Sequence, residues 1–441
     1  MNFDADTIVA RATPAGTGGI GIVRVSGDRV ASIAATMLGR VPAPRHATLS
    51  TMHDAGGAAI DRGIALFFEA PHSYTGEDVL ELHAHGGTQV VSMLVDACVA
   101  LGARRAEPGE FSRRAFLNER LDLAQAEAVA DLIEAGTAQA ARAALRSLAG
   151  EFSAAVNALV RQLTDLRVYV EAAIDFPDDD IDFLGDDELA RRLVECERAF
   201  DELLARAGTG RVLRDGYRIV LVGKPNAGKS SLLNRLSGED TAIVTEIAGT
   251  TRDILREHID VDGLDVELVD TAGLRDNPDV IEKEGIRRAR EAMHNADAVI
   301  WVQDATDTDA GELPERVADG VPVLIVRNKM DLPGAATADD AVALSARTGA
   351  GLDVLRERIR ELAGYGDPGE GAFTARQRHV DALAEAAARF RAGAAALSER
   401  RAGELLAEEL RLAQTALGRI TGAVSADDLL GEIFASFCIG K

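Results

Sequence analysis

The chain has 441 residues, of which 47% are hydrophobic and only 4% aromatic, and its formal net charge at pH 7 is −24. This length favours about three domains with aliphatic cores, and the acidity argues against capture of RNA phosphates by this chain unaided. Three cysteines without a spacing pattern argue against a disulfide framework, and no apolar run approaches the roughly 20 residues needed to span a bilayer, so we expect a cytoplasmic protein without membrane contact.

The first half of the chain is expected to form a small α/β domain followed by helices. Residues 1–118 alternate short β-branched runs with Gly/Pro turns, which is typical of a small α/β domain. Residues 119–215 carry apolar side chains at helical spacing, beginning with Leu121 and Ala124, and this pattern predicts helices. An acidic stretch at 175–182 interrupts the pattern and predicts a loop.

The second half predicts an inserted domain. Residues 216–363 alternate strand-like and helix-like runs, as a doubly wound, mostly parallel sheet requires. Residues 364–441 begin with a Gly/Pro linker (364–371) and return to helices, among them 380–391 and 405–417. Both linkers of the inserted domain therefore join one helical bundle, which can pass a change in that domain to the rest of the molecule.

A phosphate-binding loop is predicted at residues 223–230, where Gly-Lys-Pro-Asn-Ala-Gly-Lys-Ser matches G-x-x-x-x-G-K-[ST]. The loop follows a strand-like apolar run (219–222) and opens a helix-like run (231–236). In such a loop, backbone N–H groups and the helix N-terminus point at phosphate oxygens. Lys229 is then expected to reach the β- and γ-phosphates, and Ser230 to bind Mg²⁺.

Two further loops predict that the base is guanine. Asn328, Lys329 and Asp331 form N-K-x-D at the end of a strand-like run, and Ser345 opens a second base-contacting loop. A carboxylate accepts two N–H bonds from a guanine edge, whereas adenine presents the wrong donors and leaves polar groups unpaired.

A fourth element lies between these motifs. Residues 266–270 predict a strand that ends in Asp270-Thr-Ala-Gly273; Asp270 is expected to hold Mg²⁺ through water, and the Gly273 N–H to approach the γ-phosphate. The four elements have the order and spacing of a Ras-like P-loop GTPase, so the predicted ligand is GTP. The residues predicted to contact GTP are Asn226, Ala227, Gly228, Lys229, Ser230, Ser231, Thr245, Glu246, Ile247, Ala248, Gly249, Thr250, Thr251, Asp270, Thr271, Ala272, Gly273, Asn328, Lys329, Met330, Asp331, Ser345, Ala346 and Arg347.

The hydrolytic apparatus departs from the Ras pattern. Leu274 occupies the position where Ras-like switches carry a water-orienting glutamine, and leucine cannot hydrogen-bond to water. Arg252 and Arg275 are candidates for an arginine finger. The predicted first switch (245–253) supplies Thr251 as the second Mg²⁺ ligand beside Ser230. Its carbonyls, near Asn226, are able to surround a monovalent cation that stands in place of an arginine finger.

Three dispersed signatures carry a family resemblance. Residues 6–27 include Asp6-Thr-Ile-Val-Ala and a Gly-Gly-Ile-Gly-Ile-Val-Arg run; residues 74–87 and 108–118 follow; and the chain ends Phe437-Cys-Ile-Gly-Lys441. On these grounds the chain resembles, from end to end, the TrmE-type (MnmE family) tRNA modification GTPases. That family helps to install a carboxymethylaminomethyl-type group on C5 of the wobble uridine, U34.

The resemblance implies a fold and a hydrolytic site. The implied architecture is an N-terminal tetrahydrofolate-binding and dimerisation domain, and a helical bundle interrupted by a Ras-like G domain. Potassium would activate hydrolysis when two G domains pair. The matching K⁺ ligands are Asn226, Thr245, Ile247 and Thr250. Glu282 matches the family's water-orienting glutamate, although on its own it is typical of a solvated helix charge.

The resemblance also implies a tetrahydrofolate, expected in its 5,10-methylene form. The matching folate contacts are Arg24, Glu81, Arg120 and Lys441. Many relatives carry lysine where this chain has Arg120, which changes reach and hydrogen-bonding geometry. The implied partners are a second copy of the chain, the FAD-dependent subunit of the same modification complex in a heterotetramer or larger assembly, and tRNA. A basic partner that holds much of the tRNA would reconcile RNA binding with the acidity of this chain.

Cysteines and histidines leave alternatives open. Cys438 is a candidate reactive thiol for one-carbon chemistry, but a lone cysteine is more often a small buried hydrophobe. Cys98 and Cys196 lie in apolar helix-like runs and are expected in cores. His83 and His85 would share one face of a strand, as in a zinc site, but no third ligand follows at a suitable spacing, so a structural or pterin-lining role is favoured.

Two other functions fit parts of the sequence. A ribosome-assembly GTPase that binds rRNA would share the G domain, but such proteins usually add an RNA-binding module, and no GXXG-type loop or basic tail is found here. A folate-dependent one-carbon transferase regulated by a G domain would bind folate and turn over without tRNA.

Overall fold

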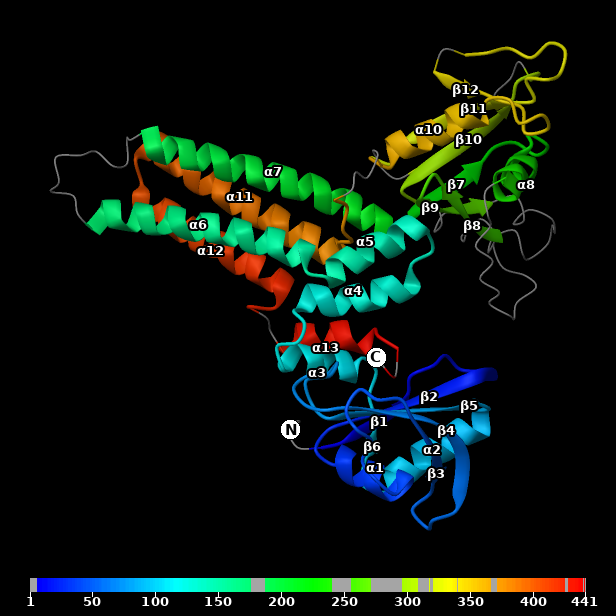
Figure 1. Cartoon of the computed structure of the whole chain (residues 1–441). Coiled ribbons are helices and arrows are strands. Elements are labelled where there is room, and N and C mark those ends of the chain that lie inside the picture. The colour runs from blue at the N-terminus through cyan, green and yellow to red at the C-terminus, as the bar shows by residue number, and fades with distance from the viewer. Residues whose placement is uncertain are drawn as a thin grey trace, which may run out of the picture. The chain divides into compact units, whose positions relative to one another are not determined.

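The structure is a computed structural model that describes residues 6–175, 187–239, 255–270, 296–307, 317, 320–338, 340–365, 371–424, 427–438 and 440 (Figure 1). The chain divides into two compact units, Met1–Ala130 with Thr415–Lys441, and Asp131–Gln414. Within the described residues, no helix is both long enough and apolar enough to cross a membrane.

The first unit is built on a six-stranded sheet in the order β3-β4-β5-β2-β1-β6, in which only β1 and β6 pair in parallel. The strands are β1 (Ile8–Arg11), β2 (Gly18–Ser26), β3 (Thr48–His53), β4 (Ala59–Phe68), β5 (Val79–Gly86) and β6 (Arg104–Arg105). Side chains alternate along each strand, so that Val23, Val25, Leu80 and Leu82 face one core. Helices α1 (Val30–Leu38) and α2 (Thr88–Ala100) pack on that core.

A small helical layer completes the first unit. It contains α3 (Glu110–Leu117), the start of α4 (Leu123–Glu134) and α13 (Asp427–Ala435). Leu123 and Ala126 of α4 pack in one cluster with Ile433 and Phe434 of α13 and with Phe437. The C-terminal segment is therefore tied into the same unit as the N-terminal sheet.

Long helices open and close the second unit. They are α5 (Ala138–Leu148), α6 (Glu151–Asp175), α7 (Asp187–Asp215), α11 (Gln377–Arg400) and the greater part of α12 (Gly403–Thr421), whose residues from Thr415 on belong to the first unit. Helix α7 lies beside α11 (Figure 1), where the rings of Phe200 and Phe390 are 5.4 Å apart. Both predicted C-terminal helices are longer than the ranges 380–391 and 405–417. Most of the predicted acidic loop lies outside the described residues.

A second six-stranded sheet lies between α7 and α11 in the sequence. Its order is β12-β11-β10-β7-β9-β8, and every pair is parallel except β8–β9. The strands are β7 (Tyr217–Val222), β8 (Leu255–Val261), β9 (Leu264–Asp270), β10 (Ala298–Asp304), β11 (Val323–Asn328) and β12 (Ala341–Ala343). This is the predicted doubly wound, mostly parallel sheet, and its carboxyl edge is where such folds bind ligands.

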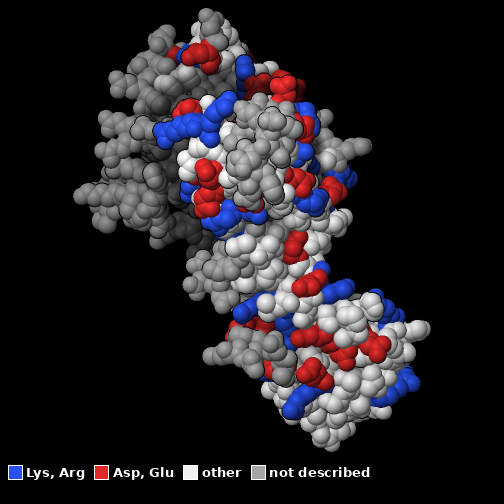
Figure 2. All heavy atoms as spheres, turned by 90° about the vertical axis from the view of Figure 1, so that its left-hand side faces the viewer, with Lys and Arg blue, Asp and Glu red and all other residues white. Residues whose placement is uncertain are grey.

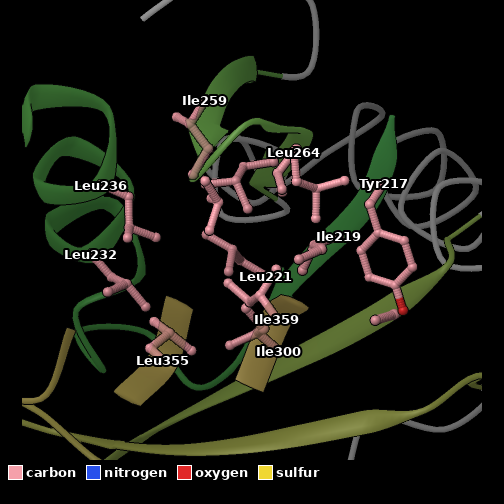
Figure 3. Close-up of a cluster of buried hydrophobic side chains, with 14 of the residues drawn as sticks. Tyr217, Ile219, Leu221, Leu232, Leu236, Ile259, Leu264, Ile300, Leu355 and Ile359 are labelled. Atoms are coloured by element: carbon pink, nitrogen blue, oxygen red, sulfur yellow. The ribbon is translucent and has the colours of Figure 1, made fainter. Parts of the chain in front are cut away.

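Both faces of this sheet are apolar, which explains the continuous hydrophobic runs of its strands. On one face, helices α8 (Lys229–Glu239) and α10 (Leu352–Leu362) contribute to the core. Figure 3 shows Leu232 of α8 and Leu355 of α10 in the same cluster as Leu221 of β7 and Ile300 of β10.

Two sets of contacts join this sheet to the helices of its unit. Asp131 accepts hydrogen bonds from Arg214 at the end of α7 (3.1 Å) and from Arg376 just before α11 (2.7 Å). One carboxylate therefore binds both segments that connect the sheet to the helices, the one before β7 and the one before α11. The Thr137 hydroxyl donates to the Gly263 carbonyl in the β8–β9 turn (3.0 Å). The β8–β9 hairpin, which lies between the predicted first switch and the Asp270–Gly273 motif in the sequence, is therefore anchored to the N-terminus of α5.

Candidate functional site

The predicted phosphate loop connects β7 to α8 and has an unusual backbone. Asn226 and Gly228 have positive φ angles of 63° and 95°. A Cβ on Gly223 would lie 2.2 Å from the Val302 carbonyl oxygen, so only glycine fits there. Lys229 is buried, and its Nζ donates to the carbonyls of Gly223 (3.0 Å) and Lys224 (3.1 Å), which folds the loop around the lysine amine.

Asn328 joins three loops of the site. Its side chain is buried; Nδ2 donates to the Ala227 carbonyl (3.0 Å), and Oδ1 accepts from the Ala346 N–H (2.9 Å). A Cβ on Gly228 would lie 2.2 Å from Asn328 Nδ2, so the close approach also requires glycine. Asn328 therefore links the phosphate loop to the loop that begins at Ser345.

Asp331 is the acceptor of the predicted guanine site. Its Oδ1 accepts from the Ser345 hydroxyl (2.7 Å), and Arg347 Nε lies 3.4 Å from Oδ2. The hydrogen bond from Ser345 lowers the pKa of Asp331, which keeps the carboxylate ionised and able to accept N–H groups. The Met330 N–H donates to the Leu344 carbonyl (3.1 Å), so the two base-contacting loops lie side by side.

Sequence reasoning missed Asp304, the last residue of β10. Its Oδ2 lies 2.7 Å from Lys329 Nζ, and Oδ1 accepts from the Thr306 N–H (2.9 Å) and hydroxyl (2.7 Å). The Lys329 ammonium lowers the pKa of Asp304 to about 2. Only its position pointed to Asp304: it ends β10, which lies in the sheet between β7, the strand before the phosphate loop, and β11, the strand before N-K-x-D. A pocket beside the phosphate loop is lined by Lys224, Pro225, Asn226, Ala227, Val302, Gln303, Asp304 and Asp307.

Only some of the other predicted site residues lie within the described ranges. Ser230 and Ser231 lie in the first turn of α8, and Asp270 ends β9, paired in register with Leu221 of β7. The predicted residues that lie outside the described ranges are Thr245, Glu246, Ile247, Ala248, Gly249, Thr250, Thr251, Thr271, Ala272, Gly273, Glu282 and Lys441, together with Leu274 and the arginine-finger candidates Arg252 and Arg275. Among the residues that are described, no group of three or more His, Cys, Asp and Glu side chains is arranged to hold a metal ion.

The predicted folate residues Arg24 and Glu81 meet on neighbouring strands of the first sheet. Arg24 Nη2 lies 2.9 Å from Glu81 Oε1, and His83 Nε2 lies 3.3 Å from Glu81 Oε2. The Arg24 guanidinium also lies over the rings of Tyr74 (5.4 Å) and Phe111 (5.8 Å). Charged and aromatic groups thus gather on one patch.

Among the described residues, no hydrogen bond or ion pair joins Arg120 or His85 to Arg24 or Glu81. The exposed Arg120 lies next to Gly76, where an added Cβ would be 3.2 Å from Arg120 Cγ. His85 Nδ1 contacts Asp61 Oδ1 at 2.9 Å, whereas His83 contacts Glu81, so each histidine has its own carboxylate partner.

The three cysteines differ in their exposure to solvent. Cys98 and Cys196 are buried, as predicted, and burial raises the pKa of their thiols to about 12 and about 11. Cys438 is exposed, so its interpretation as a small buried hydrophobe is wrong. Its carbonyl accepts from the Gly109 N–H (3.3 Å) at the start of α3, which holds the backbone against the first unit while the thiol faces solvent.

Comparison with known families decides the assignment. Residues 7–120 match the family model described as the GTP-binding protein TrmE N-terminus, and residues 123–438 match the MnmE helical domain. A protein of Stutzerimonas stutzeri named tRNA modification GTPase MnmE is 54% identical over 450 residues, with 99% of each chain covered. The chain belongs to the MnmE family. This confirms the predicted family, its multidomain α/β and helical fold, and the prediction that the chain is a GTPase.

Two solved structures align with parts of this MnmE-family chain. The G domain of the Thermotoga maritima FeoB iron transporter is 25% identical and covers 33% of this chain and 98% of its own, with a TM-score of 0.25. A GTP-binding protein of Sulfolobus solfataricus in complex with GDP is 18% identical and covers 46% of this chain and 66% of its own, also with a TM-score of 0.25.

Proposed function

We propose that this chain is the GTP-hydrolysing subunit of the cytoplasmic complex that adds a carboxymethylaminomethyl-type group to C5 of U34 in tRNA. The observation that carries the proposal is the assembly of phosphate loop, N-K-x-D loop and Ser345 loop around Asn328, in a chain of this family. We assign residues 1–118 to folate binding and dimerisation, 216–363 to the G domain, and 119–215 with 364–441 to the helical domain.

The described residues bind GTP by complementary charge and hydrogen bonding. The N–H groups of the phosphate loop and the amino end of α8 would hold the β- and γ-phosphates. The Lys229 amine, which bonds loop carbonyls in this structure, would turn to the phosphates. The Asp331 carboxylate, held by Ser345, would accept the guanine N–H groups.

The metal sites are proposed on the same loop. Ser230 stands in the first turn of α8, directly after Lys229, and fits a Mg²⁺ ligand, with Thr251 as the second. Asn226, which is exposed and borders the pocket beside the loop, fits a K⁺ ligand together with Thr245, Ile247 and Thr250. When bound, the cations offset negative charge on the phosphates.

Hydrolysis is proposed to occur when two G domains pair. Glu282 would orient the attacking water. Two sets of contacts would pass a conformational change of the G domain to the helices: the bond from Thr137 to the hairpin turn at Gly263, and the bonds of Arg214 and Arg376 to Asp131.

The one-carbon site is proposed on the first unit. Arg24 and Glu81, beside the rings of Tyr74 and Phe111, offer a cation, a carboxylate and aromatic faces to a folate, with Arg120 and Lys441 as further cations. A tetrahydrofolate, in its 5,10-methylene form, would supply the one-carbon unit. The role of Cys438 in that chemistry stays a prediction, and its exposed thiol is accessible.

The partners are proposed from charge and family. Arg391 pairs with Glu197 and Asp201. The face drawn in Figure 2 carries both acidic and basic side chains among its described residues. With a net charge of −24, this chain would act with tRNA as a homodimer bound to the FAD-dependent subunit, which would hold much of the RNA.

Nucleotide specificity and cation dependence test the GTPase part of the proposal. Purified full-length chain should bind fluorescent GDP but not ADP, and Asp331→Asn should transfer preference to xanthosine diphosphate, whose edge complements an amide. Hydrolysis should be faster in KCl than in NaCl of equal ionic strength. Equal hydrolysis rates in the two salts would refute the proposed K⁺ site. Binding of ADP as tight as that of GDP would refute the proposed guanine site.

A further inference from the structure

The end of β10 carries a carboxylate fixed at both oxygens. Asp304 Oδ1 accepts two hydrogen bonds from Thr306, one from the N–H (2.9 Å) and one from the hydroxyl (2.7 Å). Its other oxygen lies 2.7 Å from Lys329 Nζ, and both side chains are largely shielded, with 24% and 30% exposed. The two bonds from Thr306 orient the Asp304 carboxylate so that Oδ2 faces the Lys329 ammonium.

The backbone around this ion pair is fixed as well. Asp304 stands opposite Asn328 in the β10–β11 register, and the Ala305 N–H donates to the Asn328 carbonyl (2.8 Å). Lys329 has a positive φ of 69°, a conformation that a lysine rarely adopts without support from its surroundings. Neighbouring contacts thus hold Lys329 in an uncommon conformation within the base-binding loop.

We propose that Asp304 is a positioning residue of the guanine-nucleotide site, which acts through Lys329 by holding its side chain in place before the nucleotide binds. The inference rests on the proposed GTP site. It adds a residue from outside the recognised motifs, 25 positions before the lysine it orients. A long, flexible lysine loses rotamer freedom when it is ordered, and Asp304 removes that cost from the binding step.

A double-mutant cycle in the full-length chain tests this role. Asp304→Asn keeps the shape and the acceptor for Thr306 but removes the charge that faces Lys329. Lys329→Met keeps the aliphatic stem and removes the ammonium. The dissociation constant of fluorescent GDP is measured for wild type, both single variants and the double variant. Asp353→Asn, on α10, where the side chain is fully exposed, controls for the loss of one negative charge.

We expect Asp304→Asn to weaken GDP binding by about three- to tenfold, and to have less than about a twofold effect in the Lys329→Met background. Unchanged affinity in Asp304→Asn would overturn the proposal. An equal loss in both backgrounds would also overturn it, because the effect would then come from β10 rather than from the lysine. If wild type itself binds no guanine nucleotide, the proposed GTP site fails instead.

Discussion

Replacing Asn328 by alanine is expected to destabilise the G domain even when no nucleotide is bound. The side-chain amide bridges the Ala227 carbonyl and the Ala346 N–H, and it lies in a buried position between two loops. Alanine removes both hydrogen bonds and leaves two buried polar groups without these partners. The effect is therefore on the folded loops themselves and precedes any effect on base recognition.

The size of the effect follows from those two groups. A buried donor or acceptor left without a partner costs about 1–3 kcal/mol, so the two groups together cost roughly 2–6 kcal/mol. With a denaturant dependence of about 2 kcal/mol per molar urea, the middle of the usual range, the unfolding midpoint should fall by roughly 1–3 M.

The chain contains a built-in reporter for this measurement. Trp301 is its single tryptophan and lies on β10 of the G domain, so its fluorescence follows the unfolding of this domain. Asp331→Asn is the matched control in the same loop, because an amide oxygen still accepts from Ser345. It should change the unfolding free energy by no more than about 0.5 kcal/mol and alter guanine binding. An unchanged midpoint for Asn328→Ala without nucleotide would refute the reasoning.

Three other outcomes are expected. Gly228→Ala should lower the unfolding free energy of the G domain by about 1–3 kcal/mol, because φ at this position is 95° and the added Cβ would clash with the side-chain amide of Asn328. The same Trp301 fluorescence midpoint measures this loss. A hydrogen bond with Asp265 raises the pKa of His258 in the folded protein, so this bond stabilises the fold fully below the unfolded pKa of about 6.5 and less as pH rises through the folded pKa. The thermal midpoint of wild type should therefore exceed that of His258→Gln by more at about pH 5.5 than at about pH 9. A difference that does not change with pH would contradict this. In native protein a maleimide should label exposed Cys438 and spare buried Cys98, as peptide mass spectrometry would reveal.

Local patterns in the sequence predicted the elements that carry the nucleotide site. The apolar run before the phosphate loop is β7, the run after it is α8, and N-K-x-D follows β11, because loop chemistry and strand periodicity are local properties. The helix predicted at 380–391 stops before Gly393, whereas α11 continues to Arg400. Gly393 lies against α12, where an added Cβ would be 3.0 Å from Leu406, so tertiary packing overrides its low helix propensity.

Interactions between distant residues were not predictable in this way. Asn328 contacts Ala227 across 101 positions, and Asp304 contacts Lys329 across 25, and neither partner is encoded in a local period. The exposure of Cys438 was also missed, since a residue type gives only an average tendency to be buried. The sequence thus indicated which loops form the site, and the structure added how they hold one another.

Mass-spectrometric analysis of wobble-uridine nucleosides, in tRNA from cells that lack this gene, tests the proposed role in tRNA modification. We expect the C5-aminomethyl-type groups to be lost. The wild-type chain should restore them, whereas Lys229→Ala, which lacks the phosphate-loop amine, should not. An unchanged nucleoside profile in cells without a second copy of the gene would contradict the account and would favour a role in ribosome assembly.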